Sequence, residues 1–75
     1  MIDLIAVESS NVMAIGYADG VLAVKFRGGT LYEYRGVPPE VHAALMAAAS
    51  KGSFLARHVV RNSAYQVMKI APTRA

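Results

Sequence analysis

The sequence has no cysteine and no tryptophan among its 75 residues, and it has only three prolines. Without cysteine there is no disulfide framework, no thiolate nucleophile and no Cys-type zinc site, and this absence fits a reducing compartment. Charged residues make up 17% of the chain, whereas hydrophobic residues reach 55%. This length and composition predict a single domain, residues 1–75, with one hydrophobic core and marginal stability.

Long hydrophobic runs are also missing. The apolar stretch from Met1 to Val7 has no preceding basic segment, carries Asp3 and ends at Glu8, so it does not match a signal peptide. No stretch approaches the roughly 18 to 20 apolar residues that cross a bilayer. We therefore expect a soluble, cytoplasmic protein that does not contact a membrane.

Patterns of catalytic and metal-binding residues are absent as well. His42 and His58 supply two ligands without a nearby acid or thiol, which does not make a metal site. The serines lie in no Gly-x-Ser-x-Gly motif, and Gly28-Gly29 lacks the Lys-Ser/Thr of a phosphate loop. We expect no catalytic residue, no metal and no cofactor, and hence a protein that is not an enzyme.

The first half of the chain shows the patterns of β-strands. Met13 to Tyr17 is followed by Asp19-Gly20, a dipeptide typical of the type I′ hairpin turn. Val21 to Phe26 and Thr30 to Arg35 then alternate in polarity on either side of a glycine-rich turn. These patterns predict a three-stranded antiparallel meander.

Two short helices are expected after the meander. Pro38-Pro39 interrupts the sheet but suits the first turn of a helix, where Glu40 complements the helix dipole. Gly52 is placed to end this helix in a left-handed conformation, and Ser53 to cap a second, shorter helix.

The predicted fold class is α+β, with the meander and two helices packed on one of its faces. Leu4 to Val7 adds either a short strand or a docked arm, and Tyr65 to Ile70 alternates loosely enough to suggest a closing strand. The sheet therefore has three or four strands in this prediction. The tail from Pro72 onward is expected to fray.

Several short motifs together resemble the KTSC domain family. They are Ser9-Ser10, Ile15-Gly16-Tyr17, Leu22 to Phe26, Gly29, Tyr32-Glu33-Tyr34, Gly36-Val37-Pro38 and Ser50 to Leu55. The central Tyr-x-Tyr is the signature of that family, and the resemblance covers roughly residues 9 to 60. The chain departs from the family pattern at Ala56 and Val60, where relatives often carry Asn and a basic residue.

The resemblance implies a small stand-alone bacterial domain. Related domains lie at the C-terminus of some lysyl-tRNA synthetases. The role of the family is not established, and RNA binding is the function suggested for it. The resemblance therefore implies RNA as the partner to test.

The environment of Tyr32 and Tyr34 depends on the length of the second turn. A two-residue turn at Gly28-Gly29 would place Lys25 opposite Tyr32, giving an exposed face of tyrosines and cations on which unpaired bases could stack. A three-residue loop, Arg27 to Gly29, would instead place apolar side chains opposite both tyrosines. The second register separates polar from apolar side chains better, so we favour structural tyrosines packed beneath the helices.

Charge is distributed unevenly along the chain. All five acidic residues lie in the first forty positions, whereas the region from Val41 to Ala75 carries only basic charges. A positive surface of this kind can follow a phosphate backbone, although it is also what a solvated helix surface looks like. The candidate nucleic-acid-binding residues are Lys51, Arg57, Arg61 and Lys25.

An alternative function follows from the alanines of the first predicted helix. Ala43, Ala44, Ala47 and Ala48 would leave a flat, weakly polar surface that another helix could approach closely. The sequence therefore predicts a small non-enzymatic binding module with RNA as the leading partner. The alternative is a protein–protein interaction or self-association module, paired with a host protein or forming a homo-oligomer.

Overall fold

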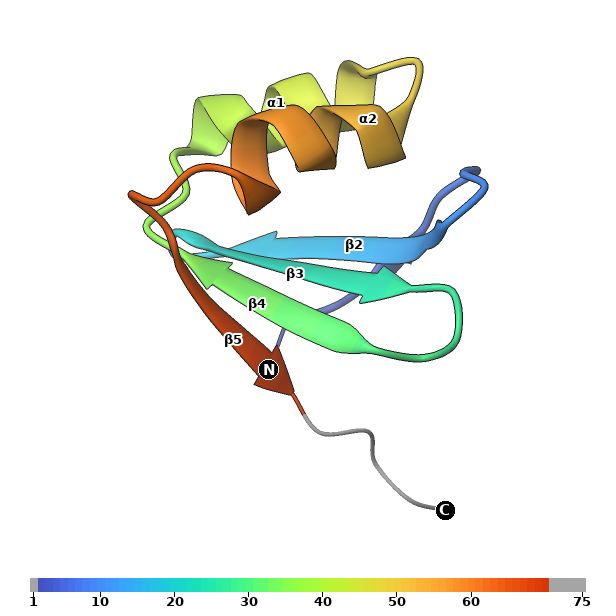
Figure 1. The fold of residues 1–75 in the computed structure, drawn as a ribbon, viewed down its shortest axis with the longest axis horizontal. Coiled ribbons are helices and arrows are strands. Elements are labelled where there is room, and N and C mark those ends of the chain that lie inside the picture. Colours follow the sequence, from blue (N-terminus) through green and yellow to red (C-terminus); the bar gives the residue numbers. More distant parts are fainter. Residues whose placement is uncertain (1, 71–75) are drawn as a thin grey trace.

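The structure is a computed structural model that describes residues 2–70. A five-stranded antiparallel sheet carries a helical layer on one face (Figure 1). The strands are β1 (Ile5–Ala6), β2 (Val12–Ala18), β3 (Val21–Phe26), β4 (Leu31–Arg35) and β5 (Gln66–Ile70), and they lie in the sheet in chain order. The helical layer comprises α1 (Pro39–Ala47), α2 (Lys51–Leu55) and η1 (Ala56–Val60), a π-helical turn that continues α2.

The α+β prediction is confirmed, with five strands in place of three or four. Both optional segments pair with the meander: β1 aligns Ile5 with Ile15 of β2, and β5 runs antiparallel to β4. The predicted frayed tail from Pro72 lies outside the described residues. No helix in the described part of the chain is long and apolar enough to span a membrane.

The two hairpins of the meander have the predicted turns. Asp19 and Gly20 have φ values of 50° and 77°, as a type I′ turn requires. In the second hairpin the Phe26 N–H donates to the Thr30 carbonyl at 2.9 Å, which closes a three-residue loop over Arg27 to Gly29. The register that places apolar side chains opposite both tyrosines is therefore the one observed, and it buries Tyr34 fully and Tyr32 in part.

The core lies between the sheet and the helices. Tyr34 pairs with Leu22, and Tyr32 with Val24, so the two tyrosines share the helix-facing side of the sheet with apolar residues of β3. Tyr34 is only 5% exposed. The buried cluster consists of Val12, Ile15, Leu22, Val24, Tyr34, Val37, Leu45, Leu55 and Val59.

The junction between the helices differs from the prediction. α1 ends at Ala47, and Gly52 lies inside α2, which begins at Lys51 with Ser50 as its N-cap. The Ser50 hydroxyl accepts a hydrogen bond from the Ser53 N–H at 3.3 Å, so the cap lies one turn earlier than expected. Glycine suits position 52 because a Cβ there would lie 2.5 Å from Asn11 Oδ1.

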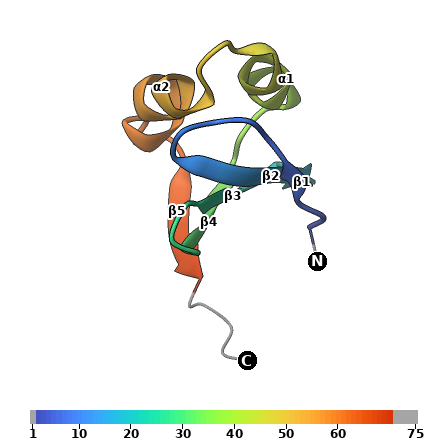
Figure 2. The same cartoon turned by 90° about the vertical axis from the view of Figure 1, so that its right-hand side faces the viewer.

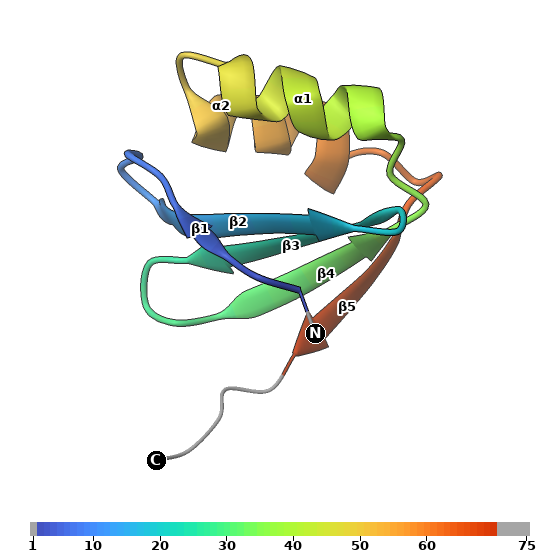
Figure 3. The same cartoon turned by 180° about the vertical axis from the view of Figure 1, so that it is seen from behind.

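The N-terminal segment leads into β1 at the edge of the sheet (Figure 3), and residues 2–4 lie against the face of β2 that points away from the helices. A Cβ on Gly16 of β2 would collide with the Asp3 carbonyl oxygen and lie 2.6 Å from Ile2 Cγ2. Gly16 pairs with Ala23 and therefore faces away from the helices. Of the two alternatives predicted for Leu4 to Val7, the short strand is the one observed, because Ile5 and Ala6 pair with β2. Residues 2–4 lie over Gly16.

Candidate nucleic-acid interface

Tyr32 and Lys69 lie directly opposite each other across β4 and β5. Because directly paired residues of antiparallel strands point to the same side, Lys69 shares the helix-facing side with Tyr32. Tyr32 is partly buried and its ring contacts that of Phe26 edge to face, with centroids 5.8 Å apart. Lys69 is exposed, and so is Val67 on the same side of β5, at 59%. The helix-facing side of the sheet is therefore exposed to solvent at β5.

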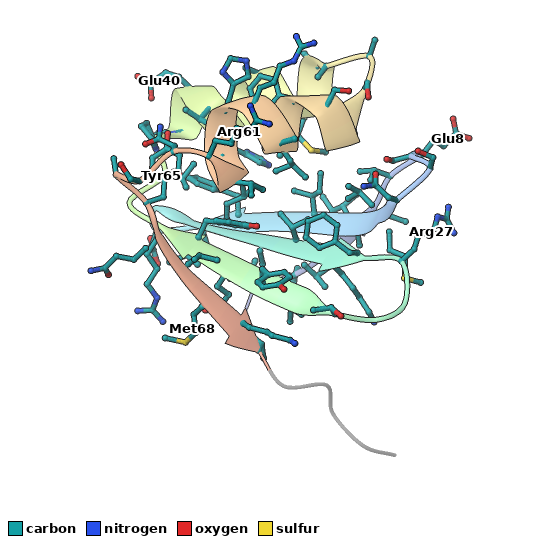
Figure 4. The ribbon with its side chains drawn as sticks, in the orientation of Figure 1. Glu8, Arg27, Glu40, Arg61, Tyr65 and Met68 are labelled. Carbon is teal, nitrogen blue, oxygen red and sulfur yellow. The ribbon has the colours of Figure 1, made fainter. Side chains whose placement is uncertain are left out.

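The helical segment above this half of the sheet carries two arginines. Figure 2 shows α2 on the β5 side of the molecule and α1 on the β1–β2 side. Arg57 lies in η1 and Arg61 follows it, and both are exposed. Figure 4 shows Arg61 above the sheet and Met68 below it, on opposite sides of β5. We refer to Phe26, Tyr32, Lys69, Arg57 and Arg61 as the aromatic–basic surface.

The structure does not bring the four cationic residues predicted from the sequence together in one place. Lys25 pairs with Leu31 and Ala14, so it lies on the sheet face opposite the helices, away from Arg57 and Arg61. Lys51 lies at the junction of the helices, where its Nζ donates to the Ala48 carbonyl at 2.9 Å. A cation there stabilises the C-terminal end of α1, so Lys51 has a structural role.

Tyr34 is a core residue. Burial raises the pKa of its hydroxyl above the ordinary value, and the neighbouring Tyr32, whose ring centroid is 6.3 Å away, raises it further. The buried ring rules out Tyr34 as a stacking partner. Within the Tyr-x-Tyr motif, Tyr32 is therefore the more exposed of the two tyrosines.

Each histidine contacts one aromatic ring. The His42 ring stacks on Tyr17 with centroids 4.7 Å apart and an interplanar angle of 7°. The His58 ring lies 4.6 Å from that of Phe54. Across residues 2–70, no three potential metal-ligating side chains of His, Asp or Glu gather in one place.

Two members of the aromatic–basic surface were not candidates from the sequence. Lys69 lies opposite Tyr32 only because β5 pairs with β4. The two residues are more than thirty positions apart along the chain. Phe26 has the pattern of an ordinary apolar strand residue, and only its contact with Tyr32 reveals its position. The local signal for Lys69 is the alternation of Tyr65 to Ile70, which places it on one side of a strand.

A model of the KTSC domain matches residues 8–65. A protein of Tsukamurella paurometabola is 51% identical over 51 residues, which cover 65% of this chain and 76% of that protein. An uncharacterized protein of Stutzerimonas stutzeri is 44% identical over 50 residues, covering 64% of this chain and 70% of that protein. The crystal structure of a KTSC domain protein from Yersinia pestis superimposes with a TM-score of 0.80 at 35% identity, over 95% of this chain and all of the other (100%).

Proposed function

We propose that this chain, which belongs to the KTSC domain family, is a non-enzymatic module that binds single-stranded RNA through the aromatic–basic surface. The observation that carries the proposal is the pairing of Tyr32 with Lys69 on the open, helix-facing side of the sheet. Proteins that bind unpaired nucleotides combine such an aromatic ring with a nearby cation.

The two residue types divide the work of binding. An aromatic ring on a sheet contributes about 1–3 kcal/mol for each base that stacks on it. Lysine and arginine side chains neutralise phosphates and release counterions. Tyr32 with Phe26 beside it is suited to the first role, and Lys69, Arg57 and Arg61 are suited to the second.

The charge of the molecule favours the same partner. The net charge is +3, and positions 41 to 70 contain no acidic residue. The helical layer and β5 therefore present cations with few carboxylates nearby to neutralise them. A single-stranded polyanion is attracted to such a surface, and its affinity should fall as salt rises.

The test compares two lysines on opposite faces of one sheet. Binding of a labelled mixed-sequence single-stranded RNA is measured by fluorescence anisotropy over a range of salt. Lys69→Ala should weaken binding and reduce the slope of log K against log salt by about 0.7, the value for one phosphate contact. Lys25→Ala makes the same charge change on the other face and should leave both quantities unchanged.

A second pair of variants tests the stacking role. Tyr32→Phe keeps the aromatic ring and should bind RNA as the natural chain does. Tyr32→Leu removes the ring and should cost about 1–3 kcal/mol of binding free energy. Equal losses for Lys25→Ala and Lys69→Ala, or no binding by the natural chain, would reject the proposal.

Self-association through α1 is the second candidate. Ala43, Ala44 and Ala47 are exposed on α1, whereas Ala48 follows the last residue of α1 and is half-buried. If a second copy packs on α1, sedimentation velocity should show a mass that rises with concentration, and Ala44→Glu should abolish that rise. A monomer at all concentrations would reject this candidate.

A further inference from the structure

The outer edge of β5 is open to a further strand. β5 is the last strand of the sheet, and in the part of the chain that the structure describes no strand lies beyond it. It is a five-residue strand without proline, whereas β1 at the opposite edge has two residues. An edge strand of this kind can pair with another extended chain.

The hydrogen-bond pattern of the sheet identifies which backbone groups point outward. Phe26 and Thr30 form a hydrogen-bonded pair, and such pairs alternate along an antiparallel ladder. Tyr32 and Tyr34, which are two and four residues beyond Thr30, therefore direct their backbone groups toward β3. Glu33, between them, directs its backbone groups toward β5.

The same alternation applies to β5. Met68 lies opposite Glu33, so its backbone groups bond to β4. Val67 and Lys69, on either side of Met68, direct their N–H and C=O groups away from the sheet. Two donors and two acceptors are thus placed to receive an extended chain.

Exposed apolar side chains flank these backbone groups on both faces of β5. Val67 is 59% exposed on the helix-facing side, and Met68 is 49% exposed on the other side. Met68 does not fill a gap in the core, because it lies on the face of β5 that points away from the helices and is about half exposed. An added strand would cover parts of both side chains and gain apolar burial.

The charge near the outer edge of β5 determines which kind of extended chain can bind there. On the helix-facing side the added strand would lie beside Lys69 and on the side of the molecule where α2 lies, which continues into η1 with Arg57 and ends at Arg61. A second copy paired antiparallel about Met68 would bring two Lys69 side chains within about 7–8 Å of each other. Like charges therefore disfavour self-pairing, and carboxylates on the incoming chain complement the site.

We propose that the outer edge of β5 binds an extended, acidic segment of another protein by β-strand addition. The segment carries carboxylates on the side that faces the helical layer and apolar side chains on the side of Met68. The backbone of Val67 and Lys69 supplies the hydrogen bonds. This proposal does not rest on the proposal of RNA binding, although Lys69 takes part in both.

The experiment uses the full chain and three labelled peptides of equal length. One alternates glutamate and valine, one alternates lysine and valine, and one is the glutamate–valine peptide with alternate backbone nitrogens methylated. The first should bind, the second should not, and methylation should weaken binding by at least about tenfold because it removes backbone donors. Hydrogen exchange should show new protection at the Val67 and Lys69 amides and no change at Met68, whose amide is already bonded.

Charge reversal at one position sharpens the test. Lys69→Glu should lose the acidic peptide and gain the basic one, whereas Lys25→Glu, on the other face, should change neither. If Lys69→Glu does not fold, Lys69→Gln should still show weaker binding of the acidic peptide. Equal binding of methylated and unmethylated peptides, or no binding of the acidic peptide, would overturn the proposal.

Two further outcomes distinguish this proposal from RNA binding and from the pairing of β5 with a second copy of the chain. Tyr32→Leu should weaken RNA binding and leave peptide binding unchanged, so failure of either proposal is recognised independently. A concentration-dependent dimer whose β5 amides are protected without any peptide would overturn the proposal in favour of self-pairing.

Discussion

The hydroxyl of Tyr17 in β2 donates a hydrogen bond of 2.6 Å to the carbonyl of Val37, in the connection between β4 and α1. Val37 is buried, and the His42 ring of α1 stacks on Tyr17 from the helical layer. One side chain therefore ties the sheet to the start of α1. The hydrogen bond satisfies a carbonyl group that the connection would otherwise bury without a partner.

Tyr17→Phe should therefore destabilise the domain. Removing the hydroxyl leaves the Val37 carbonyl without this donor, which costs about 1–2 kcal/mol of unfolding free energy. Urea denaturation followed by circular dichroism measures the effect. Tyr32→Phe is the matched control, since the Tyr32 hydroxyl makes no hydrogen bond within residues 2–70, and it should change stability by less than about 0.5 kcal/mol. Equal effects in the two variants would contradict the assigned role of Tyr17.

The meander was predictable because its signals are local. Asp19-Gly20 specifies its own turn, and the alternation on either side of Gly28-Gly29 selects the register that pairs Tyr32 with Val24. A slip of one residue would have exposed the apolar side of β4. The buried position of Tyr34 follows from this register alone.

The candidate site was less predictable because it depends on long-range pairing. The sequence predicts that Lys69 lies on a strand. It lies beside Tyr32 only because that strand, β5, pairs with β4. Lys25 was a candidate on charge, and the same register that buries Tyr34 moves Lys25 to the opposite face. The cap at Ser50 was missed because both Ser50 and Ser53 are good N-cap residues, and local sequence does not choose between them.

Gly16→Ala should destabilise the domain although alanine is otherwise acceptable in a strand. The new Cβ would collide with the Asp3 carbonyl oxygen and Ile2, so the N-terminal segment must shift, at a cost of about 1–3 kcal/mol. A chain in which residues 2–4 are deleted should tolerate the same substitution with little further decrease in stability. Thermal denaturation of the four proteins gives the coupling between the two changes. Additive effects would show that the segment does not lie over Gly16 in solution.

The stability of the domain should fall at alkaline pH partly because of Tyr34. Its pKa is raised in the folded state by burial and then by Tyr32, so the unfolded chain releases this proton more readily. The contribution of Tyr34 is fully present below its unfolded pKa of about 10 and is lost as pH rises through the higher folded value. Unfolding free energies from about pH 8 to pH 11 should therefore fall more steeply for the natural chain than for Tyr34→Phe. A difference between the two proteins that stays constant with pH would contradict the assigned burial.

Arg57→Ala with Arg61→Ala should weaken RNA binding because both residues are exposed, Arg57 within η1 and Arg61 directly after it, in the helical layer on the side of the sheet that carries Tyr32 and Lys69. Removing one phosphate-binding side chain should reduce the slope of log K against log salt by about 0.7, and removing both should reduce it by about 1.4. Lys25→Ala with Arg35→Ala removes the same charge from the opposite face. Arg35 is exposed and forms an ion pair of 3.6 Å with the partly exposed Glu33, and such a surface pair contributes little to stability, so this control should fold normally.

The two double variants separate a localised interface from a general effect of net charge. Both lower the charge from +3 to +1, since each removes two cations. If RNA responds only to the overall field, the salt slopes should fall equally in both proteins. If RNA binds the aromatic–basic surface, the slope should fall only in the variant without Arg57 and Arg61. Tyr32→Leu should then weaken binding without changing the slope, because stacking on an uncharged ring releases no counterion.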